Sequence, residues 1–191
     1  MPRIYLLVLI VSGLWVSSEI GLAILTHSSR RKDVSKREGT SLRRLWLTIS
    51  PSTMLGGFWS IQQVGFIRFA RNYFMYGGLI LIILGLVIRW KAIFTLRRYF
   101  TADVSILEDH KIIKTGEYKF IRHPAYAGSL VSFFGLGWAL GNWVSFMIIF
   151  FPILFAFIRR IKIEEETLVS ALGEEYAEYM RKTKRLIPKI Y

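Results

Sequence analysis

The chain has 191 residues, 53% of them hydrophobic, and a mean hydropathy of +0.39. It carries 26 Lys and Arg residues against 13 Asp and Glu, a net charge of +13, and no cysteine, which excludes disulfides and thiol chemistry. Few soluble domains of this size are so apolar, and the apolar residues fall in blocks long enough to form membrane-spanning helices. The composition therefore predicts an all-α, polytopic integral membrane protein.

The strongly basic balance would indicate nucleic-acid binding in a soluble protein. Here the Lys and Arg residues crowd between the apolar blocks, as they do in cytoplasmic loops of membrane proteins. Anionic lipid headgroups attract such loops. We therefore expect the lipid bilayer, and no nucleic acid, as the partner of this charge.

Five candidate spans follow one another at about residues 4–25, 45–66, 73–94, 124–140 and 143–161. The second is the least apolar, since it contains Pro51, Gln62 and Gln63. Gly141-Asn142 predicts a tight turn, so the last two spans should form a helical hairpin. Glu19 is the only acid inside a span, and such a residue is a candidate for function.

The loops predict an orientation. Basic residues are frequent in segments 27–44 and 97–123 and after residue 158, and an odd number of spans places all three on one side. That side should be cytoplasmic, with the N-terminus outside and the active site on the cytoplasmic face. Arg68 and Arg71 lie on the opposite side and are outnumbered.

Beyond the fifth span, charged residues from 162 to 184 alternate with Leu168, Leu172, Tyr176 and Tyr179 at helical spacing. This pattern predicts a C-terminal amphipathic cytoplasmic helix, broken or bent near Gly173. We therefore divide the chain into an N-terminal three-helix membrane region, residues 1–95, and a second region, residues 96–191. The second region would comprise a cytoplasmic loop, the hairpin and the C-terminal helix, and it is the part that would be catalytic if the chain is an enzyme.

Two polar groups flank the predicted hairpin. His123 precedes Pro124 where a cytoplasmic loop enters the membrane, and Glu164-Glu165-Glu166 follows the fifth span. Each is ordinary alone, because aromatic and basic residues are common at the interface and charged residues at helix ends. The hairpin should bring His123 and Glu164 to one membrane face, where together they would form a polar site. We expect no metal there, because the three histidines are not at paired-ligand spacing.

A set of motifs from about residue 97 to 190 resembles the isoprenylcysteine carboxyl methyltransferase family, part of a wider group that includes phospholipid N-methyltransferases. The motifs are His110-Lys111-Ile112-Ile113, Gly116, Tyr118, Arg122-His123-Pro124-Ala125-Tyr126, Arg160, Glu164-Glu165 and Gly173-Glu174-Glu175-Tyr176. The resemblance implies S-adenosylmethionine as methyl donor, bound in a cytoplasmic pocket that the C-terminal helix caps.

The resemblance also implies roles for individual residues. Arg160 matches an arginine near the substrate carboxylate, and Glu165 is the nearest candidate for a base. The family's glutamine upstream of His110 has no clear counterpart, and its eukaryotic members have more N-terminal spans, so the acceptor is less defined than the cofactor. Cofactor contacts are implied for His110, Lys111, Ile112, Ile113, Tyr118, His123, Pro124, Ala125, Tyr126 and Glu164.

The chemistry favours a carboxylate on a prenylated or lipid-like acceptor. A carboxylate is already ionised at neutral pH and needs only orientation, which Arg160 could supply by bidentate pairing. A phospholipid amine or a thiol is an alternative acceptor that would need Glu165 to remove its proton. Two further alternatives are a sterol-type membrane reductase using NADPH and a non-catalytic lipid-binding membrane protein.

Overall fold

The computed structural model describes residues 3–27, 36–62, 64–100 and 112–191. Over this part of the chain every regular element is a helix, so the predicted all-α class is confirmed there. The α-helices are α1 (Arg3–His27), α2 (Lys36–Ser60), α3 (Arg71–Leu96), α4 (Pro124–Ala139), α5 (Trp143–Leu172) and α6 (Glu174–Lys182). The short 3-10 helices are η1 (Arg97–Tyr99) and η2 (Gly116–Lys119).

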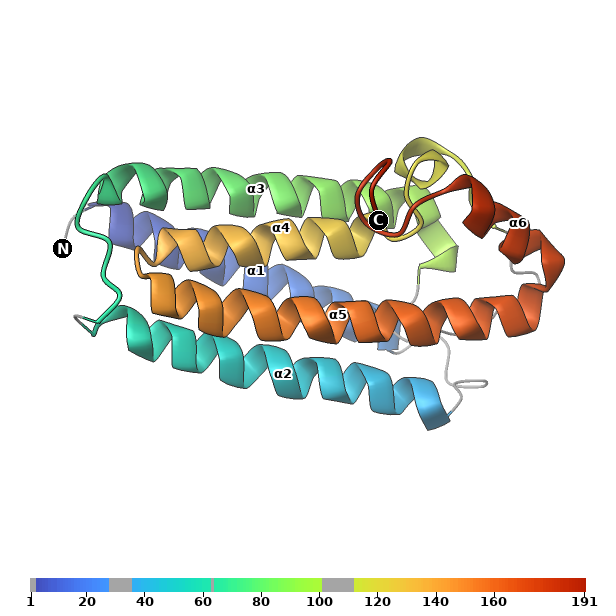
Figure 1. Ribbon diagram of the computed structural model, residues 1–191, viewed down its shortest axis with the longest axis horizontal. Coiled ribbons are helices and arrows are strands. Elements are labelled where there is room, and N and C mark those ends of the chain that lie inside the picture. The colour runs from blue at the N-terminus through green and yellow to red at the C-terminus, as the bar shows by residue number, and fades with distance from the viewer. Residues whose placement is uncertain (1–2, 28–35, 63, 101–111) are drawn as a thin grey trace.

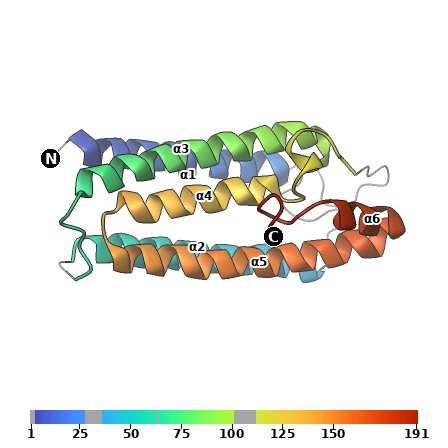
Figure 2. The same ribbon diagram turned by 45° about the horizontal axis from the view of Figure 1, so that its top comes forward.

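The helices α1 to α5 lie side by side along one long axis (Figure 1). The turned view shows α6 and the last residues of the chain gathered at one end of this bundle, beside the start of α4 (Figure 2). We call this end, which holds the start of α4 and the ends of α3 and α5, the site end. The opposite end, which holds the α4–α5 turn at Gly141, is the far end.

Two helices of the described chain, α3 and α5, are long and apolar enough to cross a membrane. A shorter apolar stretch, Leu6–Leu22, lies in α1, and α4 has only 16 residues. By length and composition α3 and α5 agree with the predicted membrane protein, and the number of five spans stays a prediction.

Several helix boundaries differ from those predicted. Helix α2 begins and ends earlier than the predicted 45–66. Helix α5 continues to Leu172 instead of ending near residue 161, because charged side chains do not interrupt a helical backbone. The helix ends at Gly173, whose φ of 58° suits glycine, and α6 begins at the next residue.

The predicted turn between α4 and α5 is present at the far end. Asn142 caps α5, since its Oδ1 accepts hydrogen bonds from the backbone N–H groups of Val144 (2.9 Å) and Ser145 (3.1 Å). Its Nδ2 donates to the carbonyl of Val64 at 3.0 Å, which ties the hairpin to the segment between α2 and α3. Asn142 is fully buried by these contacts.

Helices α3 and α4 approach one another at the level of their backbones. A Cβ atom on Gly85 would lie 2.4 Å from the carbonyl oxygen of Gly128, and one on Gly128 would lie 2.6 Å from the backbone nitrogen of Arg89. Only glycine fits at such a contact, the usual device for close packing of membrane helices. This contact fixes where the first turns of α4 lie relative to the end of α3.

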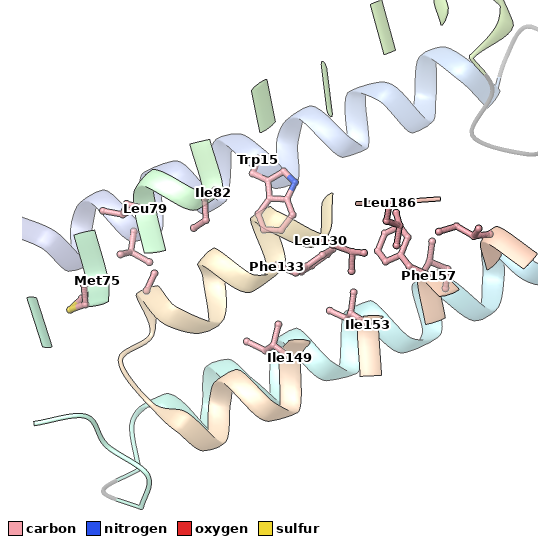
Figure 3. Close-up of a cluster of buried hydrophobic side chains, with 14 residues drawn as sticks. Trp15, Met75, Leu79, Ile82, Leu130, Phe133, Ile149, Ile153, Phe157 and Leu186 are labelled. Carbon is pink, nitrogen blue, oxygen red and sulfur yellow. The ribbon is translucent and has the colours of Figure 1, made fainter. Parts of the chain in front are cut away.

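The main hydrophobic cluster joins both predicted regions of the chain. Trp15 of α1 packs edge-on against Phe133 of α4 at a centroid distance of 4.7 Å, and Phe157 of α5 lies beside them (Figure 3). Leu186, from the C-terminal segment, is also part of this cluster. The two predicted regions thus share this cluster, and the division at residue 95 stays a prediction.

The absence of native cysteine makes the orientation testable with single cysteines. Asn142 and Thr183 are buried and unsuitable, whereas Phe69 at the far end is 88% exposed and Thr115 before η2 is exposed. We expect Phe69→Cys to react with an impermeant thiol reagent in intact cells and Thr115→Cys to react only after the membrane is opened, because the basic loops should be cytoplasmic. Reaction of Thr115→Cys alone in intact cells would reverse the orientation.

Candidate functional site

Two neighbouring carboxylates at the site end face different surroundings. Glu164 and Glu165 follow one another on α5, and successive helical residues point about 100° apart. The side chain of Glu165 is buried, with 3% exposure, whereas that of Glu164 keeps 20%. One turn of helix thus supplies one enclosed carboxylate and one more accessible carboxylate.

Glu165 accepts hydrogen bonds from two arginines. Arg122 Nε donates to Oε1 at 2.8 Å, and Arg185 donates to Oε2 through Nε and Nη2, both at 2.8 Å. His123 Nε2 lies 3.3 Å from Oε1. A buried carboxylate is tolerated only when it is paired in this way.

The same contacts dock the end of the chain on the segment before α4. The backbone N–H of Arg122 donates to the carbonyl of Lys184 at 2.7 Å, and that of His123 donates to the carbonyl of Arg185 at 3.0 Å. Arg122 Nη1 donates to the carbonyl of Met180 in α6 at 3.0 Å. The C-terminal segment is therefore part of the site.

Tyr126 links the accessible carboxylate to the arginine that the family resemblance singles out. Its hydroxyl donates to Glu164 Oε2 at 2.6 Å and accepts from Arg160 Nε at 2.9 Å. Arg160 is buried, and the Tyr126 ring stacks on the His123 imidazole with centroids 5.6 Å apart. His123, Tyr126, Arg160 and Glu164 thus form one connected group, as the sequence predicts for His123 and Glu164.

Three buried tyrosines outside the spans, Tyr118, Tyr176 and Tyr179, lie at the site end. Burial, followed by the charge of Glu164, raises the pKa of both Tyr118 and Tyr176. Burial raises the pKa of Tyr179 to about 12, and its hydroxyl donates to the carbonyl of Tyr118 at 2.6 Å. All three phenols are therefore protonated at neutral pH.

The pKa of Glu165, which lies beyond the apolar part of α5, is strongly lowered. Burial alone would raise the pKa, but hydrogen bonds from His123 and Arg122 outweigh it and hold the pKa at about 2. A general base works best with a pKa near the operating pH. Glu165 is therefore suited to holding its partners in place and poorly suited to removing a proton.

The remaining residues predicted to contact the cofactor lie in three different parts of the chain. Pro124 and Ala125 are buried in the first turn of α4. Ile112 and Ile113 are half-buried in the segment that leads to η2, and His110 and Lys111 lie outside the described residues. Within the described chain no group of three or more His, Cys, Asp or Glu side chains could hold a metal ion.

Sequence patterns did not single out some of the residues that complete the cluster. Arg122 belongs to the motif Arg122-His123-Pro124-Ala125-Tyr126, but no role was predicted for it. Arg185 is 20 positions from Glu165 and lies outside any periodic pattern, so no sequence signal pointed to it. Glu19 did appear as the only acid in a span, but nothing in the sequence identified its partner, Arg89, 70 positions away.

A family model described as the isoprenylcysteine carboxyl methyltransferase family matches residues 78–170. The matched segment contains α4 and the α5 residues Arg160, Glu164 and Glu165. The predicted resemblance to this family is confirmed.

Two curated relatives are named as protein-S-isoprenylcysteine O-methyltransferases. A probable protein-S-isoprenylcysteine O-methyltransferase of Oryza sativa subsp. indica is 38% identical over 123 residues, which is 60% of this chain and 61% of the relative. The protein-S-isoprenylcysteine O-methyltransferase of Saccharomyces cerevisiae is 36% identical over 115 residues, 59% of this chain and 48% of the relative. The similarity therefore spans about half to three fifths of these proteins.

A solved structure shares the fold over nearly the whole chain. It is that of the eukaryotic intramembrane Ras methyltransferase, isoprenylcysteine carboxyl methyltransferase, without a monobody. The match has a TM-score of 0.68 at 25% identity and covers 98% of this chain and 67% of the other. Helices α1 and α2, which precede the family-model match, thus also have counterparts in that fold.

The lowered pKa of Glu165 predicts a specific loss of stability in acid. A drop from the ordinary 4.5 to about 2 corresponds to about 3 kcal/mol, present above pH 4.5 and lost as the pH falls towards 2. We expect the melting temperature in detergent to fall between pH 5 and pH 3 more steeply for the unmodified chain than for Glu165→Gln. Glu166→Gln, at the exposed next position, is the control and should keep the steep fall. Equal slopes for the unmodified chain and Glu165→Gln would contradict this assignment.

Proposed function

We propose that this chain is an integral membrane methyltransferase that uses S-adenosylmethionine to methylate a carboxylate on a prenylated or lipid-like acceptor. The observation that carries the proposal is the connection Arg160–Tyr126–Glu164. It joins an arginine suited to an acceptor carboxylate with a carboxylate suited to the cofactor, inside the segment that matches the family. The names of the curated relatives favour an isoprenylcysteine acceptor.

The donor set at the site end fits S-adenosylmethionine, which supplies a methyl group activated on a sulfonium. Glu164 Oε1 lies 3.8 Å from His123 Nδ1, beyond hydrogen-bond distance, so it can accept from a ligand hydroxyl or ammonium. The faces of Tyr118, Tyr126 and Tyr176 can attract a cation. Ile112 and Ile113 offer half-buried apolar surface of the kind that an adenine ring packs against.

The acidic residues favour a carboxylate acceptor over an amine or a thiol. An amine or thiol must lose its proton, and Glu165, with a pKa of about 2, is too weak a base for that task. A carboxylate needs only alignment with the methyl carbon, and alignment alone can supply much of the rate. Arg160 is buried and held by Tyr126, so it can present the acceptor oxygen in one orientation.

The surroundings of the site suit an acceptor that arrives from the bilayer. The charged cluster lies just beyond the apolar part of α5, and α6 and the C-terminal segment cover it on the side away from the bundle. An apolar chain would enter between helices while its polar end reaches Arg160. Closure by α6 would exclude water from the displacement. The proposed active site would lie at the cytoplasmic face if the basic loops are cytoplasmic.

Removal of the Tyr126 hydroxyl tests the hydrogen-bonded connection between Arg160 and Glu164. In Tyr126→Phe the ring that stacks on His123 stays, but Glu164 and Arg160 lose their shared partner. We expect the affinity for S-adenosylmethionine to weaken by about 1–3 kcal/mol, the usual cost of an unpaired polar group, in isothermal titration of detergent-purified protein. Tyr73→Phe, which changes an 82% exposed tyrosine of α3, is the matched control and should bind normally. Equal affinity for both variants would remove Tyr126 from the cofactor site.

The acceptor is tested with labelled methyl donor and three candidates: a prenylcysteine analogue, phosphatidylethanolamine and a small thiol. We expect transfer to the prenylcysteine carboxylate, and we expect Arg160→Ala to lower kcat/KM about 100-fold while the Kd for S-adenosylmethionine changes less than about threefold. Arg160→Lys should recover only part of the rate, because lysine lacks the planar fork. Transfer to the amine or the thiol alone would exclude the carboxylate.

A further inference from the structure

Helix α1, which lies outside the segment that matches the family, is joined to the site by a partly buried ion pair between Glu19 and Arg89. Arg89 of α3 donates from Nε to Glu19 Oε1 at 2.5 Å and from Nη2 to Oε2 at 2.6 Å. The side chains are 12% and 18% exposed. Such a bidentate pair fixes the orientation of the guanidinium and also compensates its charge.

The third donor of the same guanidinium reaches α4. Arg89 Nη1 donates to the carbonyl of Ala125 at 3.3 Å, and Ala125 lies between His123 and Tyr126 in sequence. The backbone of Arg89 also lies against Gly128, where a Cβ atom would come within 2.6 Å. Arg89 therefore contacts the first turn of α4 through both its side chain and its backbone.

We propose that Glu19 is a positioning residue that, through Arg89, sets the orientation of the first turn of α4 and hence of His123 and Tyr126. Its effect on ligand binding rests on the proposed function, whereas its effect on the α4 backbone does not. Without the Glu19 carboxylate, Arg89 would be a partly buried cation that has lost its charged partner. The guanidinium would then turn towards water or lipid phosphate and leave the Ala125 carbonyl.

A purely structural role for the pair predicts a different outcome. In that case, loss of Glu19 would lower the stability of the whole bundle without a selective effect at α4. The two roles separate when Glu19→Gln is compared with Asn142→Ala. Asn142 caps α5 at the far end and contacts none of the site residues, so its loss destabilises the bundle elsewhere.

The first measurement is hydrogen exchange of the ligand-free protein, each variant held at the same interval below its own melting temperature. We expect Glu19→Gln to raise the exchange rate of the amides at 127–130 about tenfold, beginning with Ala127, which donates to the His123 carbonyl at 3.0 Å. Asn142→Ala should leave these amides within about twofold of the unmodified chain. Unchanged exchange in Glu19→Gln, or an equal rise in Asn142→Ala, would overturn the proposal.

Glu19→Asp keeps the charge but shortens the side chain, so it serves if Glu19→Gln does not yield folded protein. We expect a rise of about threefold at the same amides, and no rise would overturn the proposal. Titration with S-adenosylmethionine follows on the same samples, with about tenfold weaker binding expected for Glu19→Gln. If the unmodified chain does not bind S-adenosylmethionine, the proposed function fails, while the exchange result still decides the role of Glu19.

Discussion

The buried carboxylate of Glu165 is the constraint on which the site depends. A charge at this depth must be paired, and its partners come from the segment before α4 and from the C-terminal segment. Arg122 and His123 from one segment and Arg185 from the other therefore meet at Glu165, although the two segments are distant in sequence. Because Glu165 sits on α5, that point is also the end of the hairpin.

The close packing of α3 and α4 supplies the second constraint. The backbones touch at Gly85 and Gly128, so the first turns of α4 cannot shift along α3 without a clash. Ser132 donates its hydroxyl to the carbonyl of Ile82 at 3.1 Å and fixes the same register. Together with the Glu165 contacts, this register holds Tyr126 where its hydroxyl can meet both Glu164 and Arg160.

Much of this arrangement could be predicted from the sequence. The apolar blocks predicted the helices, and the Gly141-Asn142 pair predicted the turn between α4 and α5. The resulting hairpin brings His123 and Glu164 together, as expected. The predicted span ended near residue 161, whereas the helix of α5 continues to Leu172, because hydropathy reports where a helix leaves an apolar environment and not where its backbone hydrogen bonds end. The predicted break near Gly173 coincides with the end of this helix.

Other features depend on contacts that no local pattern encodes. The sequence could not separate the roles of Glu164 and Glu165, because the difference lies in which partners surround each carboxyl group. The Arg185–Glu165 and Glu19–Arg89 pairs are long-range contacts, and no sequence periodicity relates the two residues of either pair. Their importance becomes visible only when burial and hydrogen bonding are known.

The most direct measurement compares Glu164→Gln with Glu165→Gln for both melting temperature and affinity for S-adenosylmethionine. If Glu164 binds the ligand and Glu165 holds the surrounding segments together, Glu164→Gln should weaken binding at least about tenfold with little change in melting temperature. Glu165→Gln should lower the melting temperature by several degrees, since about 3 kcal/mol of pairing is lost. Normal binding by Glu164→Gln, or an unchanged melting temperature in Glu165→Gln, would contradict these roles.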